Sequence, residues 1–171
     1  TEDQRKEACD FPSADGNRMV MRMIDRWIAE ATACDFKVAL EVKKPKSWLK
    51  SVSAFANGIG GTLFFGIDDD RNVVGLSDAQ TDAETISRLM KERITPYPSF
   101  VLAPARENGK DILVLSVSAG HATPYYYKAD GIMEAYIRIG NESVIAPSYV
   151  LNQLILKGMH RTYDELVSEY D

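Results

Sequence analysis

The chain contains little cysteine, little histidine and no long apolar run, and each shortage excludes a class of protein. Its two cysteines, Cys9 and Cys34, lie outside any CxxC pattern, so they supply neither a disulfide framework nor a thiolate metal site. We expect both to be free thiols in a reducing cytoplasm. Residues 1–16 lack the apolar core of a signal peptide, and nowhere do about eighteen apolar residues follow one another, so no membrane span is predicted.

Cofactor-binding motifs are equally scarce. His121 and His160 are far apart in the sequence and neither has an HxH or HxxE neighbour, so a zinc site is not predicted. The glycine-rich residues 58–61 follow a helical pattern and precede a strand. Phosphate-binding loops lie in the opposite order, between a strand and the helix that follows it. We interpret these glycines as a helix end that packs closely against a sheet.

The composition is that of a globular chain, because 171 residues with 45% apolar content suffice for one compact core. We predict a single domain over residues 17–158. A flexible segment, residues 1–16, precedes it, and a helical extension, residues 159–171, follows it and leads to further domains. The absence of a methionine at position 1 agrees with an origin in a longer protein.

Helical patterns alternate with strands in the first half of the chain, and strands dominate the second half. This order predicts an α+β domain: a mixed, mostly antiparallel sheet with helices packed against it. Apolar residues at helical spacing predict four helices, over residues 17–32, 48–57, 81–94 and 147–157. The helix ends are marked by Ser47 as an N-cap, by a capping box of Thr81 and Glu84, and by Gly158, which interrupts the last helix.

Strands are predicted over residues 36–43, 62–67, 100–106, 111–118, 125–128 and 133–139. The pairs Asn108-Gly109 and Asp130-Gly131 predict two tight hairpin turns, because these residues readily adopt positive φ. In the last strand Met133, Ala135, Ile137 and Ile139 alternate with polar residues, so Arg138 is expected to point away from the apolar face. We expect residues 125–127, three tyrosines, to pack across strands rather than to stack on unpaired bases.

The net charge of −5 argues against a general attraction to polyanions, but the charge is unevenly distributed. Between residues 36 and 50, five lysines stand against one acid, Glu41, which gives a local charge of +4. A basic segment on an acidic domain can guide a phosphate backbone to one edge, although a solvated loop has a similar composition. The candidate phosphate contacts are Lys43, Lys44, Lys46 and Lys50.

The most specific stretch is residues 48–76, where an amphipathic helix stops at Asn57-Gly58 and leads into a buried strand that ends at Asp68-Asp69. Glu41-Val42-Lys43 precedes this stretch, and Pro124-Tyr125 and the sequence YIRIG, residues 136–140, follow it. This combination resembles the AlbA_2 domain family, also called the Schlafen AlbA-like or divergent AAA-4 domain.

The matching positions extend over residues 36–145, most of the chain. The resemblance implies an α+β domain that binds nucleic acid, as in bacterial transcriptional regulators. Arg138 is the polar residue of the YIRIG segment, so it becomes a second candidate contact besides the four lysines.

A metal-dependent endoribonuclease is an alternative, because the resemblance also implies RNA cleavage by a carboxylate cluster in some Schlafen relatives. Carboxylates at the ends of neighbouring strands can share Mg²⁺ or Mn²⁺, which activates water. The candidates are Glu41, Asp68 and Asp69, with Lys43 to hold the phosphate. The resemblance implies a further glutamate at the position of Phe36, and this departure weakens the nuclease interpretation.

The sequence therefore predicts a nucleic-acid-binding domain of a cytoplasmic transcriptional regulator, with DNA as the expected partner and without a cofactor or membrane contact. The endoribonuclease is the first alternative. The second is an oligomerisation or protein-interaction module, for which a homodimer is the simplest form.

Overall fold

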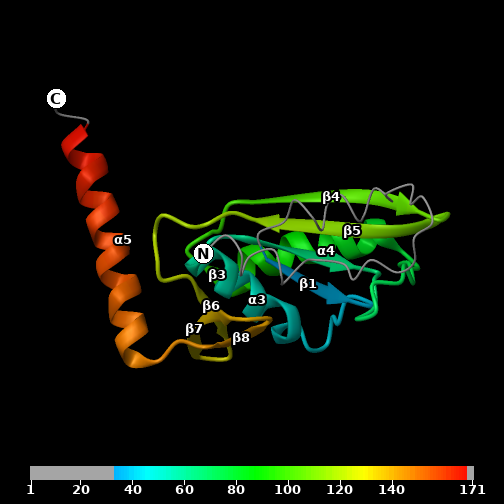
Figure 1. Ribbon diagram of the computed structural model, residues 1–171, viewed down its shortest axis with the longest axis horizontal. Helices are drawn as coiled ribbons and strands as arrows, with labels where there is room; N and C mark the ends of the chain where they lie inside the picture. Colours follow the sequence, from blue (N-terminus) through cyan, green and yellow to red (C-terminus); the bar gives the residue numbers. More distant parts are fainter. Residues whose placement is uncertain (1–32, 169–171) are drawn as a thin grey trace, which may run out of the picture.

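The computed structural model describes residues 33–168 (Figure 1). The predicted flexible segment 1–16 and the predicted helix 17–32 lie outside the described residues. The elements of the described part, in chain order, are β1 (Cys34–Lys37), α3 (Lys46–Asn57), β2 (Gly61–Phe65), α4 (Ala79–Arg93), β3 (Ile94–Thr95), β4 (Phe100–Glu107), β5 (Lys110–Val117), β6 (Tyr126–Ala129), β7 (Ile132–Ile139), β8 (Glu142–Ile145) and α5 (Ser148–Ser168).

The strands form two four-stranded sheets with the orders β1-β2-β5-β4 and β3-β6-β7-β8. Strands β1 and β2 pair in parallel, and the other strand pairs of the described chain are antiparallel. The α+β class is confirmed, but the strands form two sheets where one was expected. Residues 100–117 and 126–139 fold into the two predicted hairpins, and each turn places both of its residues at positive φ.

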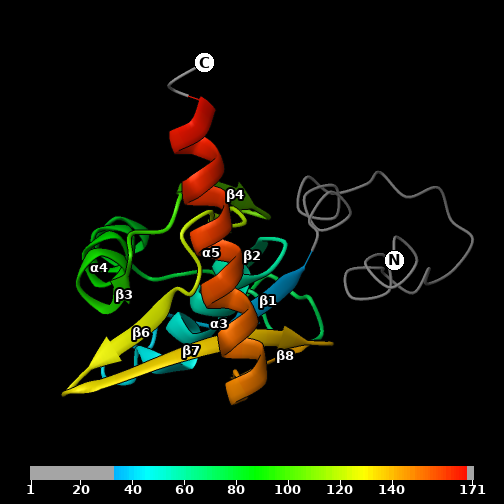
Figure 2. The ribbon, with the colours of Figure 1, turned by 90° about the vertical axis from the view of Figure 1, so that its left-hand side faces the viewer.

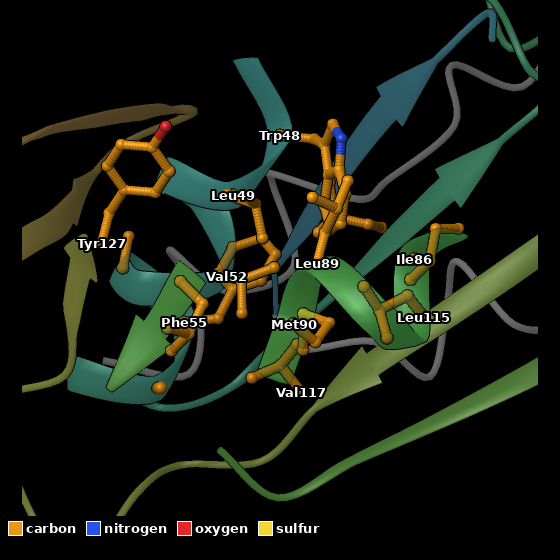
Figure 3. Close-up of a cluster of buried hydrophobic side chains, with 14 of the residues drawn as sticks. Trp48, Leu49, Val52, Phe55, Ile86, Leu89, Met90, Leu115, Val117 and Tyr127 are labelled. Carbon is orange, nitrogen blue, oxygen red and sulfur yellow. The ribbon is translucent and has the colours of Figure 1, made fainter. Parts of the chain in front are cut away.

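Helix α3 lies between the two sheets, which explains why the strands separate (Figures 1 and 2). It contacts β2 and β5 of the first sheet and β6, β7 and β8 of the second. Its apolar side chains enter one core with those of α4, β5 and β6, as Figure 3 shows for Trp48, Leu49, Val52, Phe55, Ile86, Leu89, Met90, Leu115, Val117 and Tyr127. Because the helix is covered on both sides, nine of its twelve residues are buried.

The contact of α3 with the second sheet is polar as well as apolar. Asn57 is buried, and its amide nitrogen donates to the carbonyl oxygens of Tyr125, at 3.0 Å, and Tyr136, at 2.9 Å. Its amide oxygen accepts from the N–H of Tyr125 at 2.7 Å. Ser53 accepts from the N–H of Tyr136 at 3.1 Å and donates to the carbonyl of Tyr125 at 2.8 Å. These peptide groups would otherwise be buried without partners, which is costly.

The amino ends of two helices differ from the prediction. Pro45, not Ser47, precedes α3, and the side chain of Ser47 makes no capping bond. The carbonyl of Pro45 instead accepts from the N–H of Leu49 at 3.0 Å. Helix α4 begins after Asp78, whose carboxylate accepts from the N–H of Thr81 at 3.1 Å. The hydroxyl of Thr81 also donates to this carboxylate, at 2.7 Å, and this bond, followed by the one from the N–H, lowers the pKa of Asp78. Thr81 is therefore the donor in the cap rather than the capping residue.

Strand β1 is shorter than predicted, because it ends at Lys37 rather than near residue 43. The carbonyl of Lys37 accepts from the amides of Gly66 and Ile67, at 2.7 and 3.1 Å, which is the last backbone contact of this strand pair. Residues 38–45 then form the loop that leads to α3. The prediction that Glu41 ends a strand is therefore wrong.

The glycines after α3 end the helix and allow close packing, as predicted. A Cβ atom added at Gly61, the first residue of β2, would lie 2.6 Å from the ring of Phe55. By contrast, Gly158 does not interrupt the last helix, because α5 continues through it to Ser168. A Cβ atom there would overlap the backbone of Thr123, so this glycine permits close approach and is not a helix breaker.

Cys34 is disulfide-bonded, so the expectation of free thiols is wrong for this residue. A disulfide requires that the Cα atoms of two cysteines come within about 7 Å of each other and that their Cβ atoms point toward each other. Their spacing along the chain does not determine that distance.

The polar contact of α3 with the second sheet can be tested by removing one side chain. Asn57→Ala should lower the free energy of unfolding by about 2–4 kcal/mol, because the N–H of Tyr125 and the carbonyl of Tyr136 lose their partner, while the carbonyl of Tyr125 keeps Ser53. Gln80→Ala removes an exposed amide from α4 and should change the same quantity by less than about 0.5 kcal/mol. Urea unfolding of both variants measures the difference, and equal effects would contradict the structural role of Asn57.

Candidate nucleic-acid interface

The four candidate lysines gather around the amino end of α3. Lys43 and Lys44 are exposed in the preceding loop, Lys46 is exposed in the first helical turn, and Lys50 follows one turn later and is half-buried. The first turn contains no acidic residue. The N–H groups of Ser47 and Trp48 donate within this turn, to the carbonyls of Lys44 and Pro45 at 3.1 and 3.3 Å, and the helix dipole gives this end a partial positive charge. The lysines and the helix end therefore add to the same positive potential.

Lys46 is already engaged by an acid of the second sheet. Its ammonium nitrogen lies 2.9 Å from a carboxylate oxygen of Glu134, which also accepts from the hydroxyl of Tyr136 at 2.6 Å. The hydrogen bond with Glu134 is the main cause that raises the pKa of Lys46. The bonds from Tyr136 and Lys46 lower the pKa of Glu134, while burial is the main cause that raises the pKa of Tyr136. Lys46 is thus charged but partly neutralised.

The other three lysines are less restrained. Within residues 33–160, Lys43, Lys44 and Lys50 form no ion pair. Glu41 is exposed in the same loop as Lys43 and Lys44. Among the described residues, the acids that sequence or contact places beside these four lysines are Glu41 and Glu134. We call Lys43, Lys44, Lys46 and Lys50 the lysine cluster.

Arg138 does not join this cluster, because it is built into the interior. Its side chain is 12% exposed and its guanidinium lies over the ring of Phe55, 5.2 Å from the centroid. It donates to the carbonyl of Cys34 and to the hydroxyl of Ser143, both at 2.9 Å, and lies 3.8 Å from the carboxylate of Asp35. Burial is the main cause that lowers the pKa of Arg138.

The prediction that Arg138 points away from the packed face of its strand is therefore wrong. In β7 the residues that point to solvent include Met133 and Ile139, which are 57% and 61% exposed, whereas Tyr136 and Arg138 lie against α3. The alternation of apolar residues predicted that Arg138 would be on the exposed side of β7. It lies instead against α3, because α3 offers polar partners. Ser51 of α3, for example, bonds to both Asp35 and Ser143, at 2.8 and 3.0 Å.

The carboxylates of the nuclease alternative lie at one edge of the first sheet. Glu41 and Asp68 follow β1 and β2, which are parallel, so both lie beyond the same edge. Asp68 accepts from the backbone and the amide of Asn72, at 2.8 and 3.4 Å, and so closes a turn, while Asp69 is exposed. Within residues 33–160, no group of three or more His, Cys, Asp or Glu side chains is arranged to hold a metal ion. The pair of Glu41 and Asp68 stays a prediction.

The three tyrosines at the start of β6, residues 125–127, pack within the domain. Tyr125 and Tyr127 are buried in the main core, which confirms the predicted packing, and Tyr126 is half-buried. Glu134 was not among the predicted site residues, although it determines how free Lys46 is. No sequence signal links these two residues, because they lie on different elements that only the packing of α3 on β7 brings together.

The comparisons with known proteins agree with this fold. The sequence profile of the Schlafen, AlbA_2 family matches residues 30–147, and the chain belongs to this family. The structure is similar to the N-terminal domain of a RecG-related (ATP-dependent DNA helicase) protein from Nitrosomonas europaea, with 27% identity and a TM-score of 0.48. That match covers 64% of this chain and 79% of the other.

A second similar structure is that of the DIP2311 protein from Corynebacterium diphtheriae, with 20% identity and a TM-score of 0.52. The match covers 75% of this chain but only 27% of that one, so it supports the fold alone. None of the helices within residues 33–168 combines the length and apolar character needed to cross a membrane.

Arg138 offers a test of its interior position. Arg138→Lys keeps the charge but loses the forked hydrogen bonds, so it should lower the free energy of unfolding by about 1–3 kcal/mol. Arg88→Lys changes an exposed arginine of α4 and should cost less than about 0.5 kcal/mol. Thermal or urea unfolding distinguishes them. A fully stable Arg138→Lys variant would show that the buried contacts of this residue are dispensable.

Proposed function

We propose that this domain binds nucleic acid through phosphate contacts from the lysine cluster, with Lys43, Lys44 and Lys50 as the principal contacts. The observation that carries the proposal is the convergence of these lysines with an acid-free helix end. Membership of the Schlafen AlbA_2 family supports it, since that family implies nucleic-acid binding. DNA as the preferred partner and a regulator role are further parts of the proposal.

The chemistry favours backbone contacts over base readout. Lysine is a flexible point charge that suits phosphate oxygens, and the helix dipole adds positive potential at the same end of α3. Base readout in the major groove uses a helix or strand with side chains that match base edges. The lysine cluster lies instead on a loop and on the end of a helix that is buried between two sheets. Binding should therefore depend weakly on sequence and strongly on salt.

Glu134 should moderate this binding. It holds Lys46 at 2.9 Å, and its negative charge lies at the edge of the lysine cluster, where it repels phosphate. The neutral variant Glu134→Gln should therefore bind duplex DNA more tightly than the natural chain. Electrophoretic or fluorescence titration at low salt measures the change. A weaker complex after this substitution would place the nucleic acid elsewhere.

Salt-dependent titration of a triple variant tests the proposal directly. Each lost phosphate contact lowers the slope of log affinity against log salt by about 0.9 on B-DNA, so Lys43→Ala, Lys44→Ala and Lys50→Ala together should lower it by about 2.7. The matched control combines Lys91→Ala, Lys128→Ala and Lys157→Ala, which removes three exposed lysines from other elements.

The control has the same net charge as the first triple variant, so it separates local contacts from the overall field. We expect its slope to stay close to that of the natural chain. If both triple variants lose the same slope, general electrostatics accounts for binding. If neither changes it, the lysine cluster does not contact phosphate. Parallel titrations with duplex DNA, single strands and structured RNA compare the partners.

A further inference from the structure

Helix α5 has two apolar faces, and the first is covered by the rest of the domain. Its inward residues, all buried or half-buried, are Val150, Leu151, Leu154, Ile155 and Gly158. Thr123 donates from its hydroxyl to the carbonyl of Leu154 at 2.7 Å, and Gly158 passes directly over the backbone of Thr123. The helix is thus fixed to the loop before β6, and its later turns extend away from both sheets (Figures 1 and 2).

The second apolar face is exposed. Tyr149, Leu156 and Met159 are 69%, 66% and 66% exposed, and they follow one another at spacings of seven and three residues. These are the a and d positions of a heptad, with Asn152 at the intervening d position. In the sequence the same spacing continues to Tyr163 and Leu166. The a and d pattern therefore spans three heptads of the sequence, and nothing within residues 33–160 covers Tyr149, Leu156 and Met159. We call the face of α5 that carries this pattern the seam.

The charges of α5 follow the same heptads. At the outer positions b, c and f, the residues are apolar or glycine where the helix lies on the domain. They become charged further along, with Lys157, Arg161, Asp164 and Glu165. The positions that flank the seam, e and g, hold Gln153, Ile155, His160, Thr162 and Val167. Since no lysine, arginine, aspartate or glutamate flanks the seam within α5, two identical helices meet there without like-charge repulsion.

From this pattern we infer that α5 pairs with α5 of a second copy of this chain in a parallel two-stranded coiled coil along the Tyr149–Leu166 seam. A seam of this kind is self-complementary, as a two-fold interface requires. Leu154, which packs against the domain, is at position f, opposite the seam, so the covered and the exposed faces of α5 lie on opposite sides of the helix. Asn152 meets its own copy, and such a buried polar pair favours two strands in register. This inference does not rest on the proposed nucleic-acid contact.

Sedimentation equilibrium of the full 171-residue chain tests the pairing. We expect a dimer, and the double variant Leu156→Glu with Met159→Glu should raise its dissociation constant at least about a hundredfold, because each copy buries two charges in the seam. Val101→Glu is the matched control, since Val101 is also 66% exposed but lies on β4. It should leave the dissociation constant unchanged.

Two further variants keep the test decisive if the double variant does not fold. Asn152→Leu should tighten the dimer at least about tenfold, because it replaces a polar d position by the preferred residue. Asn152→Cys should oxidise to a covalent dimer, which a parallel in-register pair allows, whereas Val101→Cys should not. A monomeric natural chain, a dimer that survives the double variant, or an Asn152→Leu variant with unchanged association would overturn the inference. Failure of the lysine-cluster titrations would leave it standing.

Discussion

The structure depends on the hydrogen bonds between α3 and the backbone of the second sheet. Asn57 and Ser53 supply donors and acceptors to the peptide groups of Tyr125 and Tyr136, in the way that a neighbouring strand would. The opposite side of the same helix packs Trp48 edge-on against Phe65 of the first sheet. One helix therefore joins two sheets that share no strand.

The two ends of α3 differ in exposure because of this arrangement. The middle and carboxyl end of α3 are buried between the sheets, whereas its amino end carries the lysine cluster at the surface. The helix dipole adds its positive end to the charge of the nearby lysines. The negative net charge of the chain then limits attraction to the rest of the surface, so an anion is directed to this end.

The parts of the fold that sequence predicts well are those determined locally. The hairpin turns at residues 108–109 and 130–131 need positive φ, and asparagine, aspartate and glycine supply it regardless of the surroundings. The helix of residues 48–57 and its end at the following glycines were also predicted, because they too depend on nearby residues. Membership of the AlbA_2 family was predicted from residue patterns and is confirmed over residues 30–147.

The predictions that failed depend on contacts between distant segments. The prediction for Arg138 of β7 failed because Ser51, Ser53 and Asn57 make α3 a polar surface. A prediction from periodicity assumes that the buried side of a strand is apolar. Arg138 is buried for this reason, with Asp35 and Ser143 as partners from other strands. Likewise the Lys46–Glu134 ion pair exists only because α3 lies on β7. The sequence alone therefore could not predict that one lysine of the cluster is held by an acid.

The central claim is that the amino end of α3 is where nucleic acid meets this domain. Amide chemical shifts recorded by NMR during titration with a short DNA duplex test it most directly. The account predicts that the largest shifts fall on residues 43–50 and on Glu134, with little change at Arg138. Shifts concentrated on another face, with residues 43–50 unaffected at saturation, would contradict it.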